Sequence, residues 1–232
     1  MIRIRRSQDR GVTRIGWLDG RHSFSFGEYH DPLHQGFRTL RVINEDRVAP
    51  ASGFQPHSHR DMEIVTVVLE GELEHQDSMG NRGLIRPGDT QRMTAGTGVT
   101  HSEINPSPDK PVHLLQIWLH PETRGLTPGY EQKHFSPEAR RNRLCLAASP
   151  DARDGSMKIH QDAEIWLASP EKETGLNHRI KPGRFAWVQV IKGSFFMARD
   201  TLKTGDGASF EDEPEVALTA LEDSEVLLFD LA

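Results

Sequence analysis

Short apolar segments separated by turn residues constrain the fold of this chain more than any other feature of its sequence. The 20 glycines and 14 prolines among 232 residues interrupt the sequence at short intervals. No stretch shows a sustained helical period, apart from one or two turns at SPEARR (136–141). Many short strands with regular turn signals predict an all-β protein of the sandwich or barrel type. The segments with strand character are TLRVIN (39–44), EIVTVVLEG (63–71), DTQRMTAG (89–96), VHLLQIWLH (112–120), RLCLAAS (143–149), EIWLAS (164–169), RFAWVQVI (184–191), SFFMARD (194–200), EVALTAL (215–221) and EVLLFDL (225–231).

The second half of the sequence repeats the order of the first. Each half has an apolar strand, a turn ending in glycine, a second strand, a Gly-Asp turn and a closing apolar strand. Such an internal repeat predicts two copies of one β unit. We expect a first domain over 1–123, a linker rich in proline, glycine and charge over 124–141, and a second domain over 142–232.

Composition limits the classes of partner and compartment. A net charge of −6 and a pI near 6.1 argue against binding to nucleic acid, which needs a basic surface. We expect the short basic run IRIRR (2–6) to be solvated. The single cysteine, Cys145, is expected to be a small buried side chain, and it excludes an internal disulfide. With no apolar leader segment in view, we expect a cytoplasmic monomer that does not associate with membranes.

Two clusters of histidine and carboxylate carry the chemistry. In HSHRDME (57–63), His57 and His59 stand two residues apart and would project from the same face of a strand. If the extended conformation persists, Asp61 and Glu63 lie on that face too. An HxH pair also arises by chance in a chain with this many histidines, so alone it does not separate a metal site from an ordinary polar strand start.

The second cluster lies in GTGVTHSEIN (96–105). His101 and Glu103 again stand two residues apart, hence on one face of another strand, and two glycines permit a tight turn before them. If these strands are neighbours, three imidazoles and one or two carboxylates share a cavity. Nitrogen and oxygen donors without a thiolate suit a divalent first-row metal.

The remaining histidines lack a partner at ligand spacing. His22, His30 and His34 are expected to be surface or capping residues of a loop-like segment. No role is predicted for the others, which are His75, His113, His120, His134, His160 and His178.

Longer motifs resemble a known family. HSFSFGEYHDP (22–32), GFRTLRVINED (36–46), PHSHRDMEIVTVVLEGELEHQDSMGN (56–81) and IRPGDTQRMTAGTGVTHSEIN (85–105) are similar to the pirin family of the cupin superfamily. The similarity is greatest to bacterial pirin-like proteins described as quercetin 2,3-dioxygenases, and it covers roughly residues 14 to 120. It implies a bicupin, with two antiparallel β-barrels of the jelly-roll type packed together and a metal only in the first.

Carried over residue by residue, the family's metal ligands fall on His57, His59, His101 and Glu103. The wider cupin pattern would instead take its carboxylate from the position of Glu63. Spacing alone does not choose between the two. We expect Glu103 to be the ligand and Glu63 to orient a histidine or water beside it. One divalent metal ion is expected, and Fe, Ni, Co, Mn, Cu and Zn all accept such ligands.

The resemblance also implies an activity. The expected reaction is the metal-dependent cleavage of a flavonol such as quercetin with dioxygen, which releases carbon monoxide, with Glu103 as a proton acceptor. The alternative is a metal-dependent, protein-binding regulator of the pirin type without turnover. A purely structural metal barrel is disfavoured, because a second carboxylate is present and cysteine ligands are absent.

Overall fold

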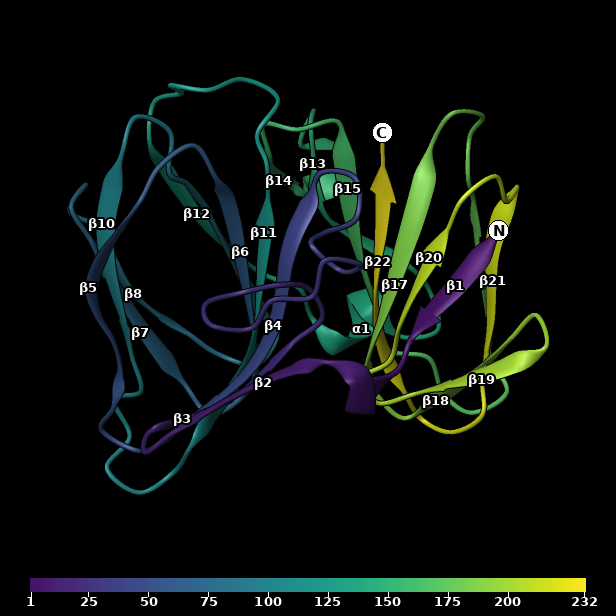
Figure 1. Ribbon diagram of the computed structural model, residues 1–232, viewed down its shortest axis with the longest axis horizontal. Helices are drawn as coiled ribbons and strands as arrows, with labels where there is room; N and C mark the ends of the chain where they lie inside the picture. The colour runs from purple at the N-terminus through teal and green to yellow at the C-terminus, as the bar shows by residue number, and fades with distance from the viewer. The chain divides into compact units, whose positions relative to one another are not determined.

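The computed structural model describes residues 1–232 as a chain built almost entirely of β-strands (Figure 1). The one α-helix, α1 (Pro137–Arg140), is a single turn capped by Ser136, whose side chain accepts a hydrogen bond from the backbone N–H of Ala139. The predicted all-β fold and the short turn at SPEARR are therefore confirmed. None of the helical segments has the length and apolar character that crossing a membrane requires.

The strands belong to two compact units. The amino-terminal unit consists of Gly11–His134 with Ile159–Gln161, and the carboxyl-terminal unit consists of Met1–Arg10, Phe135–Lys158 and Asp162–Ala232. Each unit contains one seven-stranded and one four-stranded sheet. The repeat seen in the sequence is therefore a repeat of the fold.

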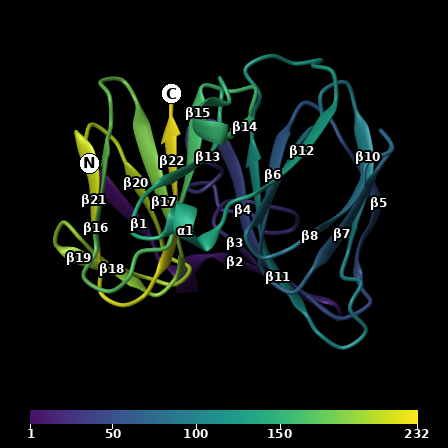
Figure 2. The ribbon, with the colours of Figure 1, turned by 180° about the vertical axis from the view of Figure 1, so that it is seen from behind.

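In the amino-terminal unit, the two sheets form separate layers (Figures 1 and 2). The seven-stranded sheet has the order β12 (Gly129–His134), β9 (Asp89–Thr94), β6 (Glu63–Glu70), β11 (Val112–Leu119), β4 (Leu40–Val48), β3 (Leu18–His22) and β2 (Gly11–Ile15). The four-stranded sheet has the order β5 (Gly53–His59), β10 (Val99–Ile104), β7 (Leu73–Asp77) and β8 (Arg82–Ile85).

The carboxyl-terminal unit has the same plan. Its seven-stranded sheet has the order β1 (Ile2–Arg5), β20 (Gly207–Phe210), β17 (Phe185–Lys192), β22 (Glu225–Leu231), β15 (Ala163–Ala168), β13 (Cys145–Ser149) and β14 (Met157–Lys158). The four-stranded sheet has the order β16 (Gly175–Arg179), β21 (Glu215–Ala220), β18 (Ser194–Met197) and β19 (Asp200–Lys203). The expected strand 194–200 is split here, because Ala198 adopts φ 54° and turns the chain.

The interior of the amino-terminal unit changes from apolar to polar along its strands. One buried cluster contains Leu18, Val48, Val68, Leu73, Ile85, Val112 and Leu114. Residues two apart on a strand share a face. Four of these apolar residues have a buried polar residue two positions away on the same strand. These are Asp46 beside Val48, Thr66 beside Val68, His75 beside Leu73 and Gln116 beside Leu114. The strands therefore present a polar layer above an apolar one.

The observed division of the chain differs from the expected domain boundaries. Met1–Arg10 belongs to the carboxyl-terminal unit, whereas residues 124–134 and Ile159–Gln161 belong to the amino-terminal unit. Residues 129–134, expected in a linker, form β12, which pairs with β9 along its whole length. This edge strand was not predicted, because its sequence is polar and lacks the apolar residues by which the other strands were recognised. The basic run at residues 2–6 is not a solvated tail, because β1 pairs with β20 and Arg6 forms ion pairs with Asp200 and Asp206.

Candidate metal centre

Two neighbouring strands, β5 and β10, bring three histidines together. The strands run antiparallel, with His57 opposite His101 and His59 opposite Val99. The ring centroid of His101 lies 4.5 Å from that of His57 and 4.9 Å from that of His59. One ligand atom from each ring lies within 4.8 Å of the other two. The three imidazoles are thus grouped as ligands of one metal ion would be.

Tight turns follow β5 and precede β10. Asp61 and Gly96 adopt φ values of 49° and 47°, and the N–H of Asp61 donates to the carbonyl of Gly96. A side chain on Gly96 would overlap the carbonyl oxygen of Leu126, so glycine is required there. The turn at Asp61 also ends the extended conformation after His59. Glu63 was expected to share the face of His57 and His59 only if the extended conformation persisted, and it does not.

The hydrogen bonds of the histidines leave nitrogen lone pairs for a metal. Nδ1 of His57 lies 2.8 Å from the carbonyl oxygen of Gln55, to which it donates its proton, so Nε2 keeps its lone pair. Nε2 of His101 is buried and has no hydrogen-bond partner. A buried nitrogen without a partner is costly unless something satisfies it. A divalent metal would do so, and the residues present fit one.

The electrostatics of the site keep the imidazoles of His59 and His101 neutral. Burial, with smaller contributions from His57, His59 and His75, lowers the pKa of His101 to about 2. Burial and the neighbouring His57 lower the pKa of His59 to about 4. Metal binding requires the neutral imidazole, so both rings are in the binding form at neutral pH.

Glu103 lies on the inner side of this cluster. It is almost fully buried, and its carboxylate accepts hydrogen bonds from the side-chain amide of Gln116 and from the hydroxyl of Thr66 at 3.4 Å. Burial raises its pKa to about 7. Its carboxylate is grouped with His101 and His75, within 4.8 Å of both. His101 therefore belongs to two overlapping groups, one with His57 and His59 and one with Glu103.

Glu63 lies elsewhere. It is three residues from Thr66 on β6, so the two side chains point to opposite faces of the sheet. Its carboxylate accepts a hydrogen bond from the backbone N–H of His160 at 3.2 Å, and it lies 3.5 Å from Nδ1 of that residue. The expectation that Glu63 shares the face of His57 and His59 was wrong.

Sequence reasoning assigned no role to His75, which the structure places against the cluster. His75 is fully buried on β7, with its Nδ1 3.5 Å from Nδ1 of His101 and its Nε2 3.3 Å from Asp77. The signal was the HQD sequence at 75–77, which puts a histidine and a carboxylate two apart on one strand.

The expectation for the early histidines was only partly right. His30 is exposed, and His34 is half-buried beside Asp31 at 2.7 Å. His22 is instead buried in β3, where its ring nitrogens lie 2.8 Å from Asn44 and 2.8 Å from Thr13. The strand that ends at His22 was not predicted, because its sequence resembles a loop.

Aromatic side chains flank the histidines on two sides. The ring of Trp118 lies 4.9 Å from that of His59 and 5.4 Å from that of Phe26. On the other side, Phe54 lies 6.1 Å from His57 and contacts Trp17 edge to face at 5.0 Å. A hollow of about 590 Å³ opens on this second side, lined by Trp17 and residues 51–57, including His57.

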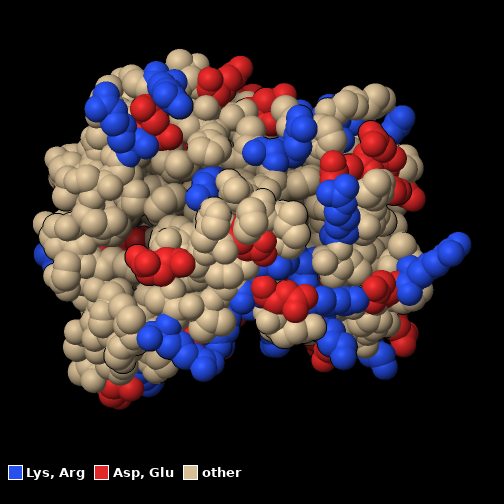
Figure 3. All heavy atoms as spheres, in the orientation of Figure 1, with Lys and Arg blue, Asp and Glu red and all other residues tan.

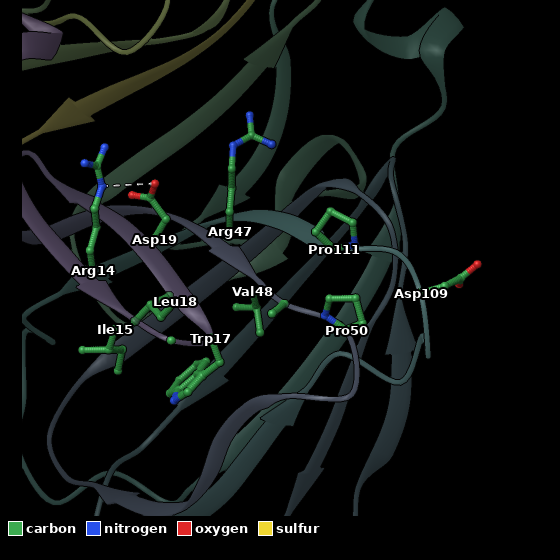
Figure 4. A pocket seen from close by; sticks show the side chains of 12 residues that line it. Arg14, Ile15, Trp17, Leu18, Asp19, Arg47, Val48, Pro50, Asp109 and Pro111 are labelled. Atoms are coloured by element: carbon green, nitrogen blue, oxygen red, sulfur yellow. Dashed lines mark ion pairs between the residues drawn. The ribbon is translucent and has the colours of Figure 1, made fainter.

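A second hollow, of about 490 Å³, shares Trp17 with the first (Figure 4). Its lining contains Pro50, Pro111 and the ion pair between Arg14 and Asp19, but no histidine. It is therefore separate from the histidine cluster, whereas the hollow beside His57 reaches it.

Comparison with known proteins matches both units. A family model described as Pirin matches residues 3–119, and a model described as the quercetinase C-terminal cupin domain matches residues 146–231. The chain is 48% identical over 231 residues to a protein of Escherichia coli strain K12 named quercetin 2,3-dioxygenase. That alignment covers 100% of this chain and 99% of the relative.

Solved structures give the same result. The crystal structure of the bacterial pirin YhhW from Escherichia coli in complex with nickel(II) is 47% identical to this chain, with a TM-score of 0.95. The match covers 100% of this chain and 99% of that one. The Escherichia coli protein YhaK is 32% identical, with a TM-score of 0.76, over 90% and 92% of the respective chains. A similar protein therefore carries a divalent metal on this fold.

Proposed function

The chain belongs to the pirin family, and on that premise we propose that it is a metal-dependent dioxygenase that cleaves a flavonol such as quercetin and releases carbon monoxide. The observation that carries the proposal is the group of three histidines, with the buried Nε2 of His101 left without a hydrogen-bond partner. Relatives at nearly half identity are named quercetin 2,3-dioxygenase or crystallised with nickel(II).

We assign the metal to His57, His59, His101 and Glu103. A divalent transition metal bound there supplies Lewis acidity, which favours deprotonation of a flavonol hydroxyl. The strands β5 and β10 fix the four side chains, since their register sets which residues stand opposite each other. Glu63, which faces His160, has no direct part in the proposed reaction.

The protein's own groups provide a proton acceptor. Glu103 is held by donors from Gln116 and Thr66, and Gln116 in turn accepts a hydrogen bond from the indole N–H of Trp118 at 3.0 Å. This contact orients the Gln116 amide so that its N–H donates to Glu103. The carboxylate is thereby oriented to accept the proton of the 3-hydroxyl group and to return it to the product.

The substrate is proposed to bind in the hollow beside His57. Its volume of about 590 Å³ is within the usual range for small-molecule sites, and Trp17 and Phe54 offer aromatic walls to a planar ring system. On the opposite side, Trp118 and Phe26 pack beside His59. The apolar layer beneath Glu103 keeps water from entering through the base of the barrel.

The setting we propose is a monomer in the cytoplasm that does not bind nucleic acid. On the face shown in Figure 3, basic and acidic side chains stand close together. The phosphate backbone of a nucleic acid binds to a surface on which positive charge is clustered. The mixed charges on this face and the net charge of −6 do not provide such a surface.

The test couples metal analysis to oxygen consumption. The purified protein is stripped and reloaded separately with Ni, Fe, Co, Mn, Cu and Zn, and oxygen uptake and carbon monoxide release are measured with several flavonols. We expect turnover with at least one metal and none for His59→Ala, which should also lose stoichiometric metal. A fully loaded protein that consumes no oxygen would contradict the proposal and favour the protein-binding regulator.

A further inference from the structure

A buried histidine and a buried carboxylate stand in line behind His101. Nδ1 of His75 lies 3.5 Å from Nδ1 of His101, and Nε2 of His75 lies 3.3 Å from Oδ2 of Asp77. His75 has no exposed surface, and His101 and Asp77 expose 2% and 7% of theirs. The proposed reaction uses neither His75 nor Asp77, so their burial needs another explanation.

The far end of this line is fixed by a turn. Oδ1 of Asp77 accepts hydrogen bonds from the backbone N–H groups of Met79 at 2.9 Å and Asn81 at 3.0 Å. Oδ2 accepts one from the side-chain amide of Asn81 at 2.9 Å. The turn between β7 and β8 thus orients the carboxylate.

The register of the sheet fixes the near end. Across the pair of β7 and β10, Asp77 stands opposite His101 and His75 stands opposite Glu103. The two residues of β10 assigned to the metal therefore each face one of these two residues of β7. This pairing holds the backbone of His75 beside the strand that carries His101 and Glu103.

This arrangement determines where the protons of both rings reside. An ionised carboxylate only accepts hydrogen bonds, so His75 carries its proton on Nε2 and offers Nδ1 as an acceptor. His101 must then donate from its own Nδ1, and its Nε2 is left with a lone pair. That Nε2 is the buried atom without a hydrogen-bond partner.

We propose that His75 is a positioning residue which, held by Asp77, fixes the tautomer and ring orientation of His101 for metal binding. The inference rests on the proposed metal site, and it goes beyond the four ligands. A carboxylate–histidine pair behind a ligating histidine stabilises the tautomer that binds, and losing such a partner weakens metal affinity by roughly 10- to 100-fold.

Two replacements of His75 separate its hydrogen bond from its bulk. His75→Leu removes the acceptor, whereas His75→Asn keeps an oxygen at nearly the position of Nδ1. His113→Leu is the matched control, because His113 is also buried on a strand of this unit and pairs with a carboxylate, Glu45, at 2.9 Å. It stands an odd number of residues from Gln116 on β11 and so faces away from the histidine cluster.

The measurements are the dissociation constant for Ni(II) and the nitrogen-15 shifts of the His101 ring in metal-free protein. We expect His75→Leu to raise the dissociation constant roughly 10- to 100-fold and to mix the two tautomers of His101. His75→Asn should restore most of the affinity, and His113→Leu should leave it unchanged.

Three results would overturn the proposal. One is an unchanged dissociation constant in His75→Leu, and another is an equal loss in His113→Leu. The third is the loss of a second bound metal ion in His75→Leu, which would make His75 a ligand together with His101 and Glu103. If the native protein itself binds no metal, the proposed function fails instead, and the tautomer of His101 still tests the line of contacts.

Discussion

His57 and His101 stand directly opposite each other on β5 and β10, and one residue further inward this register breaks. Glu103 pairs with Phe54, so β5 carries an extra residue between Phe54 and His57. The bulge contains Pro56, which has no N–H to contribute to a regular ladder. The bulge thus sets where the histidine pair stands relative to Glu103.

Exchange of each carboxylate for an amide tests which one serves the metal. Glu103→Gln should weaken Ni(II) binding and abolish turnover, because it removes the only carboxylate grouped with a histidine of the cluster. Glu63→Gln should keep the metal, because Glu63 faces His160 and an amide oxygen can still accept its backbone N–H. Metal analysis and oxygen uptake check both variants. An empty site in Glu63→Gln with a filled site in Glu103→Gln would reverse the assignment.

A glycine next to the bulge is predicted to be required for full stability. Gly53 adopts φ 153°, and a Cβ there would overlap the carbonyl oxygen of Glu103. Gly53→Ala should lower the free energy of unfolding by about 1–3 kcal/mol and weaken Ni(II) binding, because β10 must shift. Gly16→Ala is the control, since a Cβ at Gly16 meets nothing within 4 Å. Denaturant titration of the metal-free proteins measures the difference, and equal stability of the two variants would contradict the prediction.

The sequence alone predicts which residues of one strand share a face, because side chains alternate between the two faces with a period of two residues. His57 and His59 share a face, as do His101 and Glu103, because alternation within a strand is local. The adjacency of His75 and His101 is not local, since it depends on the register between β7 and β10. No spacing rule within one strand predicts it.

The misplacement of Glu63 has a different cause. Its expected position assumed an extended backbone from His59 onward. Asp61 instead adopts a left-handed conformation, which the alternation of side chains along a strand does not predict. The strand β1 was likewise hidden, because its partner β20 lies near the other end of the chain. Long-range pairing, rather than composition, decides these positions.

A buried aspartate is predicted to give the metal-free protein a pH-dependent stability. Burial, with contributions from Glu103 and Glu45, raises the pKa of Asp46 to about 7, and its Oδ1 has no hydrogen-bond partner. Between pH 4 and 7 the unfolded chain therefore loses this proton before the folded one does. The contribution of Asp46 to stability falls as the pH rises through this window.

Asp46→Asn removes that contribution while keeping the size of the side chain. Relative to the native chain, the metal-free variant should gain stability progressively as the pH rises from 4 to 7. His101, whose pKa is lowered, adds stability to both proteins as the pH rises and therefore cancels in the comparison. Urea unfolding at several pH values measures the difference. A difference that is constant with pH would show that Asp46 does not hold its proton in the folded state.

The carboxyl-terminal unit is predicted to bind no metal, although it repeats the fold. The strands that correspond to β5 and β10 are β16 and β21, which also pair antiparallel but without a bulge. Where His57 stands opposite His101, this pair instead places Leu176 opposite Leu218, both buried in an apolar cluster. The nearby His178 is already engaged by Asp230 at 2.6 Å, and Arg184 contacts the same carboxylate. Apolar side chains fill the space in which ligands would have to stand.

Elimination of the first site tests this directly. A variant with His57, His59 and His101 all replaced by alanine should bind no Ni(II), because one imidazole paired with a carboxylate does not hold a metal tightly. His178→Ala alone should keep the full metal content of the native protein. Metal analysis after gel filtration gives both values, and circular dichroism confirms that the triple variant is folded. A stoichiometric ion in that folded variant, lost again when His178 is also replaced by alanine, would place a metal in the carboxyl-terminal unit and refute the prediction.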